Sequence, residues 1–329
     1  MRTRVLWVVL ILAFISVASL LILPSSQSPT GYSVAYTSLP EVHFCPQENC
    51  TMILAKLLNS SQQSIDCALY DVDLPEILSV LTTKSQAMPV RLVTDSATFK
   101  KVSYLPFAQH GKNSSLMHNK FCIVDRRIVL TGSFNPARKS LLDNNDIVII
   151  TSRKPAANYE AEFEELWNGI FGGGNKTRSP ADARISSYFC PEDFCSSRVR
   201  AALGSANKSI HFLTFSFTHR GIATELILKK RVGLDVAGVV EKRMDLNYSA
   251  RDYLMENGIR VCLDSNTHDM HHKVFVIDSR IVITGSFNPT ENADHRNDEN
   301  VLMIDDPLIA QDYEQQFNSL YSSADCKAR

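Results

Sequence analysis

The chain lacks an excess of either charge. Its 34 Lys and Arg residues balance 35 Asp and Glu residues, so that the formal net charge is −1 and the pI is about 6.7. A protein with this balance has no global positive field to recruit nucleic acid, although a local basic cleft stays possible. Apolar residues are not scarce: they make up 44% of 329 residues, which suits a globular protein with a large core.

One long apolar run stands at the N-terminus, from Val5 to Leu23, and Arg2 and Arg4 precede it. Its nineteen residues are enough to span a bilayer, and the arginines favour an N-inside orientation. A cleaved signal peptide is the alternative, but its apolar core is usually ~7–15 residues long and no small-x-small cleavage site follows here. We expect a membrane anchor and linker over 1–33, with the rest of the chain outside the cytoplasm in either case.

The same phrase of twenty residues occurs twice, at Met117 to Pro136 and at Met270 to Pro289, and thirteen of its positions are identical. Each copy carries His-x-Lys. Since a core strand tolerates many apolar sequences of similar volume, packing alone does not require a repeated His-x-Lys. Two equivalent halves that each supply a histidine and a lysine are what a single site across an internal two-fold would need.

The repeat extends over whole domains. Each half opens with a similar cysteine-containing segment and closes with a helical stripe of matching aromatic and apolar residues. We expect a first half over 34–171, a connector rich in glycine, serine and proline over 172–187, and a second half over 188–329.

Eight cysteines are many for a reducing compartment. The pairs Cys45/Cys50 and Cys190/Cys195 occupy equivalent places in the two halves, and we expect each to form a local disulfide. A zinc site with four thiolates is the alternative. Three cysteines within apolar runs are expected to be buried small hydrophobic residues, and the eighth has no assigned role: Cys67, Cys122 and Cys262, then Cys326.

The repeated phrase reads as a strand hairpin. Side chains alternate along a strand, so each histidine shares a face with its lysine: His118 with Lys120, and His271 with Lys273. Asp125 and Asp278 lie seven residues after their histidines, an odd step, and should face away and brace the hairpin. The hairpin turn and a preceding glycine reset the register of four further polar residues, which parity therefore cannot place: Ser133, Asn135, Ser286 and Asn288.

Asp146 and Glu299 each follow their histidine by twenty-eight residues. A histidine that must hold one tautomer usually needs a carboxylate on its far nitrogen, and these two acids are the symmetric candidates. A solvated acid at a strand edge is the alternative. His272 falls on the opposite strand face and is expected to be structural. The first half has no counterpart of His268 or Asp269 as a possible ligand, which argues against a metal site there.

The pattern His-x-Lys-x4-Asp-x6-Gly-Ser-x-Asn, present twice, resembles the phospholipase D superfamily. The resemblance implies an α/β fold of two tandem phospholipase D-like domains, each a mixed sheet flanked by helices, related by a pseudo-two-fold around one metal-independent site. Asp146 departs from the family, in which Glu is commoner. The catalytic set that the resemblance implies comprises His118, Lys120, Asp125, His271, Lys273 and Asp278. The phosphate-binding set comprises Ser133, Asn135, Ser286 and Asn288.

The residue types suit phosphodiester hydrolysis, in which a neutral imidazole attacks phosphorus, a second imidazole protonates the leaving oxygen, and lysines neutralise the phosphate. No cofactor is expected, and the protein is expected to be a monomer. The anchor and the absence of excess positive charge favour a phospholipid substrate slightly. A nuclease is the alternative, supported by compact halves and local cations, and a non-catalytic phosphate-binding protein is a third, disfavoured class.

Overall fold

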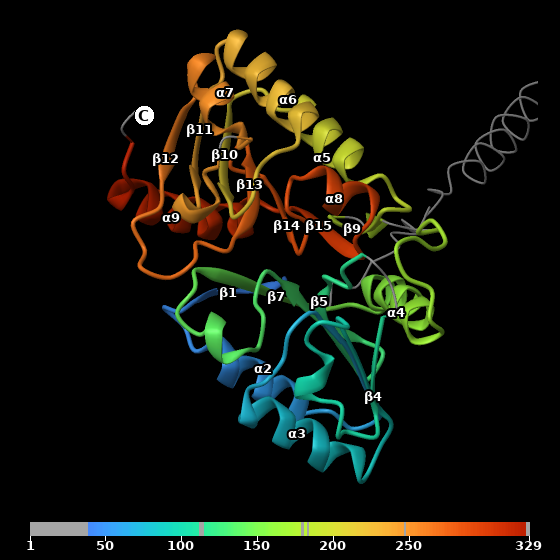
Figure 1. Ribbon diagram of the computed structural model, residues 1–329. Helices are drawn as coiled ribbons and strands as arrows, with labels where there is room; N and C mark the ends of the chain where they lie inside the picture. The colour runs from blue at the N-terminus through green and yellow to red at the C-terminus, as the bar shows by residue number, and fades with distance from the viewer. Residues whose placement is uncertain (1–38, 112–114, 179–180, 183, 247, 327–329) are drawn as a thin grey trace, which may run out of the picture. The chain divides into compact units, whose positions relative to one another are not determined.

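The computed structural model describes residues 39–111, 115–178, 181–182, 184–246 and 248–326 (Figure 1). The predicted anchor and linker lie outside these ranges. Within them, no helix is both long enough and apolar enough to cross a bilayer.

Two mixed sheets form the framework, as the sequence predicted. The first has the strand order β1-β7-β6-β5-β2-β3-β4, in which β2, β3 and β4 run parallel and the others pair antiparallel. The first half consists of β1 (Glu41–Cys45), α2 (Cys50–Asn59), β2 (Ile65–Leu69), α3 (Pro75–Ser85), β3 (Val90–Thr94), η1 (Phe99–Lys101), β4 (Ala108–His110), β5 (Lys120–Val124), β6 (Ile128–Gly132), η2 (Arg138–Ser140), β7 (Asn145–Thr151) and α4 (Arg153–Trp167).

The second sheet repeats this order, with β9-β15-β14-β13-β10-β11-β12 in place of the seven strands above and β8 added beside β9. β8 and the start of β9 fall in the predicted connector. The second half consists of β8 (Ala181–Asp182), β9 (Ile185–Cys190), α5 (Cys195–Gly204), β10 (Ser209–Thr214), α6 (Arg220–Arg231), β11 (Asp235–Val240), η3 (Lys242–Met244), α7 (Ala250–Glu256), β12 (Arg260–Leu263), β13 (Lys273–Ile277), β14 (Ile281–Gly285), α8 (Glu291–His295), β15 (Glu299–Asp305) and α9 (Pro307–Ser323).

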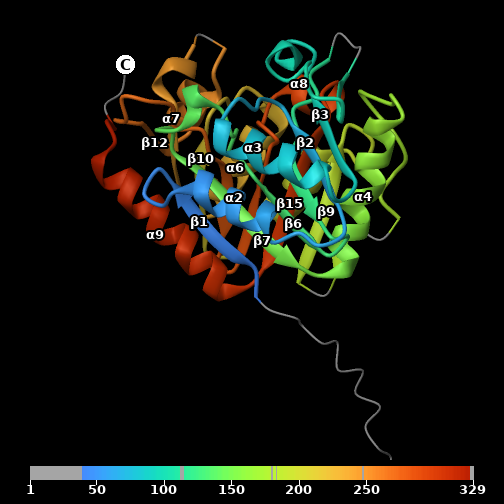
Figure 2. The same cartoon turned by 90° about the horizontal axis from the view of Figure 1, so that it is seen from below.

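Each sheet has an outer and an inner apolar face. Helices α2 and α3 cover the outer face of the first sheet, and α5, α6 and α7 cover that of the second (Figure 1). The inner faces meet along β6 and β14, and α4 and α9 pack on opposite flanks of this contact (Figure 2). Because α9 contacts β1 of the first sheet and α4 contacts β9 of the second, the two halves share a continuous interior.

The β5–β6 and β13–β14 hairpins end in tight turns. Asp125 and Arg126 have φ angles of 53° and 52°, and Asp278 and Ser279 have 55° and 50°. Two consecutive residues of positive φ produce the turn twist that matches the twist of the flanking strands. These turns lie at the far end of each hairpin from its His-x-Lys segment.

Candidate active site

The two His-x-Lys segments lie immediately before or at the start of β5 and β13. Both histidines are 8% exposed, and Lys120 and Lys273 are 1% and 2% exposed. Each histidine is fixed through its backbone by the other half. The His118 N–H donates to the Asp298 carbonyl at 2.9 Å, and the His271 N–H donates to the Asn144 carbonyl at 2.9 Å. The pseudo-two-fold therefore brings both segments to the contact between the halves.

Glu299 holds the ring of His118. Its two oxygens lie 2.9 and 2.8 Å from His118 Nδ1, and Ser286 Oγ donates to it at 2.6 Å. A carboxylate only accepts, so Nδ1 carries the proton and Nε2 keeps a free lone pair. The orienting carboxylate predicted at Glu299 is thus present, but it serves the histidine of the opposite half. The assignment of Glu299 to its own histidine, His271, was wrong.

His271 is held without a carboxylate. Its Nδ1 lies 2.8 Å from Asn145 Oδ1 and 3.1 Å from the Ser133 carbonyl oxygen. Both partners are acceptors, so Nδ1 is again the protonated nitrogen. The prediction that Asp146 orients a catalytic histidine was wrong, because Asp146 Oδ1 contacts Nδ1 of the neighbouring His272 at 3.0 Å.

A one-residue shift explains this outcome. In the strand register Cys45 faces Asn145, whereas Cys190 faces Glu299. The structural counterpart of Glu299 is therefore Asn145, and that of Asp146 is Asn300. The segment between the Gly-Ser pair and the last strand is one residue shorter in the first half. Residues at equal distance from the two histidines are therefore not structural counterparts in this last strand.

Asp146 is instead the centre of a buried network between the halves. Besides His272, it accepts hydrogen bonds from Ser133 Oγ at 2.8 Å, from Tyr313 OH at 2.7 Å and from Thr284 Oγ1. These donors hold the pKa of Asp146 at about 2 against the opposing effect of burial, with His272 contributing most. His272 is structural, as its strand face predicted.

Each lysine points back toward its own histidine. Lys120 Nζ donates to the His118 carbonyl at 2.6 Å, and Lys273 Nζ donates to the His271 carbonyl at 2.5 Å. Lys120 Nζ also lies 5.1 Å from the ring centre of Tyr70, as does Lys273 Nζ from that of Phe215. The same rings meet their histidines edge-on, with centroids 4.8 Å apart in both halves. Aromatic packing therefore sets the position of the whole His-x-Lys pair.

The buried histidines and lysines of the site have lowered pKa values, because burial and their mutual repulsion disfavour the charged forms. Burial lowers the pKa of His118, with Glu299 acting in the opposite direction, and lowers that of His271 well below its ordinary value with help from Lys273 and Lys120. Burial also lowers the pKa of Lys120 to about 7, and that of Lys273 well below its ordinary value. A bound anion would relieve this repulsion and restore the charged forms of the cluster.

Two of the four predicted phosphate-binding residues donate their hydroxyl hydrogen bonds to carboxylates of the protein. Ser133 Oγ donates to Asp146 and Ser286 Oγ donates to Glu299, so both hydroxyl protons serve carboxylates. The Oδ1 atoms of Asn135 and Asn288 are buried and have no hydrogen-bond partner among the described residues. An amide oxygen only accepts hydrogen bonds, so these atoms could not bind phosphate oxygens, and the phosphate-binding role of the two asparagines stays a prediction.

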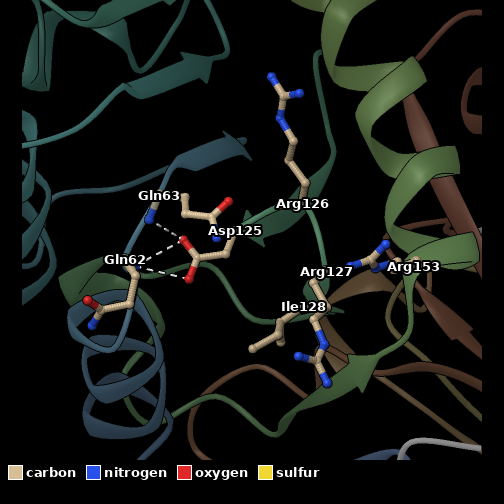
Figure 3. Close-up of a pocket in the computed structure, with 7 residues that line it drawn as sticks. All are labelled: Gln62, Gln63, Asp125, Arg126, Arg127, Ile128 and Arg153. Carbon is tan, nitrogen blue, oxygen red and sulfur yellow. Dashed lines mark hydrogen bonds between the residues drawn. The ribbon is translucent and has the colours of Figure 1, made fainter.

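Asp125 and Asp278 are not brought to the histidines. The Asp125 carboxylate accepts hydrogen bonds from the backbone N–H groups of Gln62 and Gln63 at 2.7–3.0 Å (Figure 3) and from that of Ser64 at 3.1 Å. Asp278 accepts the equivalent amides of 207–209 at 2.7–3.1 Å. Five residues of strand, about 17 Å, separate Asp125 from Lys120. Both brace the hairpin turns, as parity predicted, and their inclusion in the catalytic set was wrong.

The sequence reasoning missed one symmetric pair. Asp95 Oδ2 accepts the Met117 N–H at 2.9 Å, and Glu241 Oε2 accepts the Met270 N–H at 2.7 Å. Each acid thus fixes the residue immediately before a histidine. A usable signal existed, because each is the acid directly after an apolar strand in its half.

All eight cysteines are paired. The local disulfides Cys45–Cys50 and Cys190–Cys195 confirm the prediction, and the zinc alternative is wrong because the thiols are bonded to each other. The prediction of unpaired buried cysteines was also wrong: cross-strand pairing in the first sheet and the return of the C-terminal segment to β12 create two long-range disulfides, Cys67–Cys122 and Cys262–Cys326.

Within the described ranges, one group of three side chains could hold a metal ion, and none of its members belongs to the histidine–lysine cluster: Glu162, Glu165 and Glu192.

The two α/β halves meet at paired His-x-Lys segments, and this arrangement identifies the protein as a phosphodiesterase of the phospholipase D superfamily. The chain belongs to the family described as "Cardiolipin synthase, PLD-like domain", whose model matches residues 54–167 and 199–321.

Similar proteins support this membership. Phospholipase D of Rickettsia typhi is 33% identical over 140 residues, which cover 42% of this chain and 69% of that protein. Mitochondrial cardiolipin hydrolase of Xenopus tropicalis is 32% identical over 140 residues, which cover 41% and 67%. The phosphatidylserine synthase structure of Haemophilus influenzae Rd KW20 matches with a TM-score of 0.69 and 14% identity over 87% of each chain, a likeness of fold alone.

Proposed function

We propose that the protein hydrolyses phosphodiesters through a phosphohistidine formed on His118. The observation that carries the proposal is the unequal support of the two histidines. Glu299 contacts His118 Nδ1 at 2.8 Å, whereas His271 Nδ1 meets the neutral Asn145 at 2.8 Å. A carboxylate on the far nitrogen stabilises the positive charge that an attacking imidazole acquires.

The chemistry needs two steps. His118 Nε2 forms a bond to phosphorus while the bond to the leaving oxygen breaks, and protonated His271 gives its proton to that oxygen. Water then attacks the phosphohistidine, neutral His271 accepts its proton, and His118 is released. Lys120 and Lys273 neutralise the phosphate oxygens throughout. The negative phosphodiester itself favours the protonated form of His271 in the complex.

A phospholipid head group is the first substrate candidate. Support comes from the similar proteins named phospholipase D and cardiolipin hydrolase. A nucleic acid is the second candidate, and an exposed cation close to the site favours it. Lys139, whose side chain is 64% exposed and lies 3.1 Å from Asp71, follows Asn135 by four residues on η2.

The purified protein should be tested in parallel on phosphatidylcholine, cardiolipin, single-stranded DNA and RNA. Turnover of a lipid that changes little with salt supports the first candidate. Turnover of DNA or RNA that falls steeply with salt supports the second, since nucleic-acid binding releases counterions. Turnover of none of the four would contradict the proposal.

Chelation of metal ions should leave turnover unchanged. The proposed steps use imidazole and ammonium groups, and the Glu299 carboxylate beside His118 is occupied by hydrogen bonds with His118 and Ser286. Initial rates with and without EDTA test this directly. Loss of activity in EDTA, restored by added divalent metal, would contradict the mechanism.

We also propose that the catalytic region lies outside the cytoplasm, tethered by the predicted anchor Val5 to Leu23. Four disulfides support an oxidising compartment. Protease added to intact cells should release an active soluble fragment, and thiol labelling without reductant should miss all eight cysteines. Protection from protease together with labelled cysteines would place the region in the cytoplasm.

A further inference from the structure

Four exposed cations gather where the β5–β6 turn meets the start of α4: Arg126, Arg127, Arg153 and Lys154. We call this group the basic edge. Its three arginines line a surface pocket of about 470 Å³, beside Gln62 and Gln63 (Figure 3).

The cations of the basic edge outnumber the carboxylates beside them. The side chain of Arg126 is 73% exposed, and its Nε lies 3.8 Å from Glu160. The Asp125 carboxylate also lines the pocket and accepts hydrogen bonds from backbone amides, so Asp125 and Glu160 together offset two of the four positive charges. The turn that carries the arginines is itself held rigid by these bonds, so the cations are presented on a fixed support.

The equivalent edge of the second half lacks this excess of cations. There Ser279 and Arg280 stand in place of Arg126 and Arg127, and Asp305 and Asp306 stand at the end of β15, where the first half has Thr151 and Ser152. Both aspartates are paired, Asp305 with Arg280 at 2.6 Å and Asp306 with Arg184 at 2.9 Å. The basic edge is therefore a feature of one half and not a requirement of the fold.

We propose that the basic edge docks on an anionic phospholipid surface. Its position supports this partner. β1 begins at Glu41, which pairs with Ile149, and Ile128 at the turn pairs with Thr151 of the same strand. Residues 1–38, with the predicted anchor, thus join the described part of the chain beside the basic edge. A guanidinium matches a phosphate with two parallel hydrogen bonds, and each such cation strengthens binding to an anionic leaflet by roughly fivefold.

A tether alone would not orient the molecule. The seventeen residues from Pro24 to Pro40 can reach about 55 Å when extended, so many orientations are available without a second contact. The whole chain has a net charge of −1 and supplies no general attraction to an anionic surface. A local cluster of cations is the feature that can select one orientation.

Docking by the basic edge has a consequence for substrate access. β5 runs from Lys120 at the catalytic cluster to the turn at Asp125. With the turn on the membrane, the histidines face away from that membrane. Phosphodiesters would then arrive from the aqueous side, whether dissolved or presented by a facing surface. This inference goes beyond the proposed reaction and does not depend on it.

Hydrogen exchange of the full chain tests the proposal. The chain is bound to phosphatidylcholine vesicles with or without phosphatidylserine, and amide exchange is followed by mass spectrometry. The charge-reversed variant combines Arg126→Glu, Arg127→Glu and Arg153→Glu. A matched control makes the same change at three exposed cations of the second half: Arg200→Glu, Lys208→Glu and Arg260→Glu.

With phosphatidylserine, we expect slower exchange at 125–128 and 152–155 in the wild type and the control, and no slowing in the charge-reversed variant. High salt should remove the effect. Equal exchange with both lipids would overturn the proposal. So would slowing at 141–144 and 266–270, which would place the catalytic cluster on the membrane. Circular dichroism confirms that each variant is folded, and no step requires catalytic activity.

Discussion

Alanine at either His118 or His271 is expected to lower turnover by at least about 10⁴-fold, because each histidine acts in both proposed steps. The two variants should differ with an activated p-nitrophenyl diester, whose leaving group needs no proton. His271→Ala should still form the phosphohistidine and release a stoichiometric burst of nitrophenolate before stalling. His118→Ala should give no burst. Rapid-mixing absorbance measurements separate these outcomes.

The assignment of roles can fail independently of the mechanism. A burst from His118→Ala and none from His271→Ala would reverse the roles, and peptide analysis of the trapped intermediate would then find the phosphate on His271. His295→Ala is the matched control, because this side chain is 64% exposed and outside the cluster. Its turnover should equal that of the wild type.

Asp146→Asn is expected to destabilise the protein by about 3 kcal/mol at neutral pH, since it replaces a buried carboxylate that accepts hydrogen bonds from Ser133, Tyr313 and Thr284 and leaves donors unsatisfied. An asparagine is compatible with the site in shape, because Asn300 occupies the equivalent place in the other half. Denaturant unfolding followed by circular dichroism measures the difference. Asp312→Asn, an exposed change of the same kind on α9, should be neutral.

The destabilisation caused by Asp146→Asn should become smaller as the pH falls. The folded pKa of Asp146, about 2, lies below the ordinary value of 3.8, so its ionised form stabilises the folded state above about pH 4. That contribution, roughly 2 kcal/mol for a shift of this size, is lost as the pH falls toward 2. The gap between wild type and Asp146→Asn should narrow over this range. A gap that is constant with pH would show that the charge of Asp146 is unimportant.

Local pattern predicted much of the hairpin. The period of two placed His118 and Lys120 on one face and turned Asp125 away, and both outcomes are found. The reason is that alternation along a strand depends only on neighbouring residues. The same reasoning could not place Ser133, because a turn and a glycine interrupt the strand before it.

Contacts between distant segments were beyond that reasoning. Glu299 is one example, since 181 residues separate it from the histidine it holds. Cys67–Cys122 is another, since its pairing depends on β2 lying beside β5. Asp146 shows how equal spacing can mislead, because the first half is one residue shorter between its Gly-Ser pair and its last strand, and Asn145 therefore stands in the orienting position.

The sequence by itself determined the internal repeat, the two mixed sheets, the family and the local disulfides, because each depends on the spacing and type of residues along a continuous segment. The tertiary structure decided which acid serves which histidine, that Asp146 joins His272 at the contact between the halves, and that one edge is basic. These features depend on strand register and on how two halves meet, and neither is encoded by local periodicity.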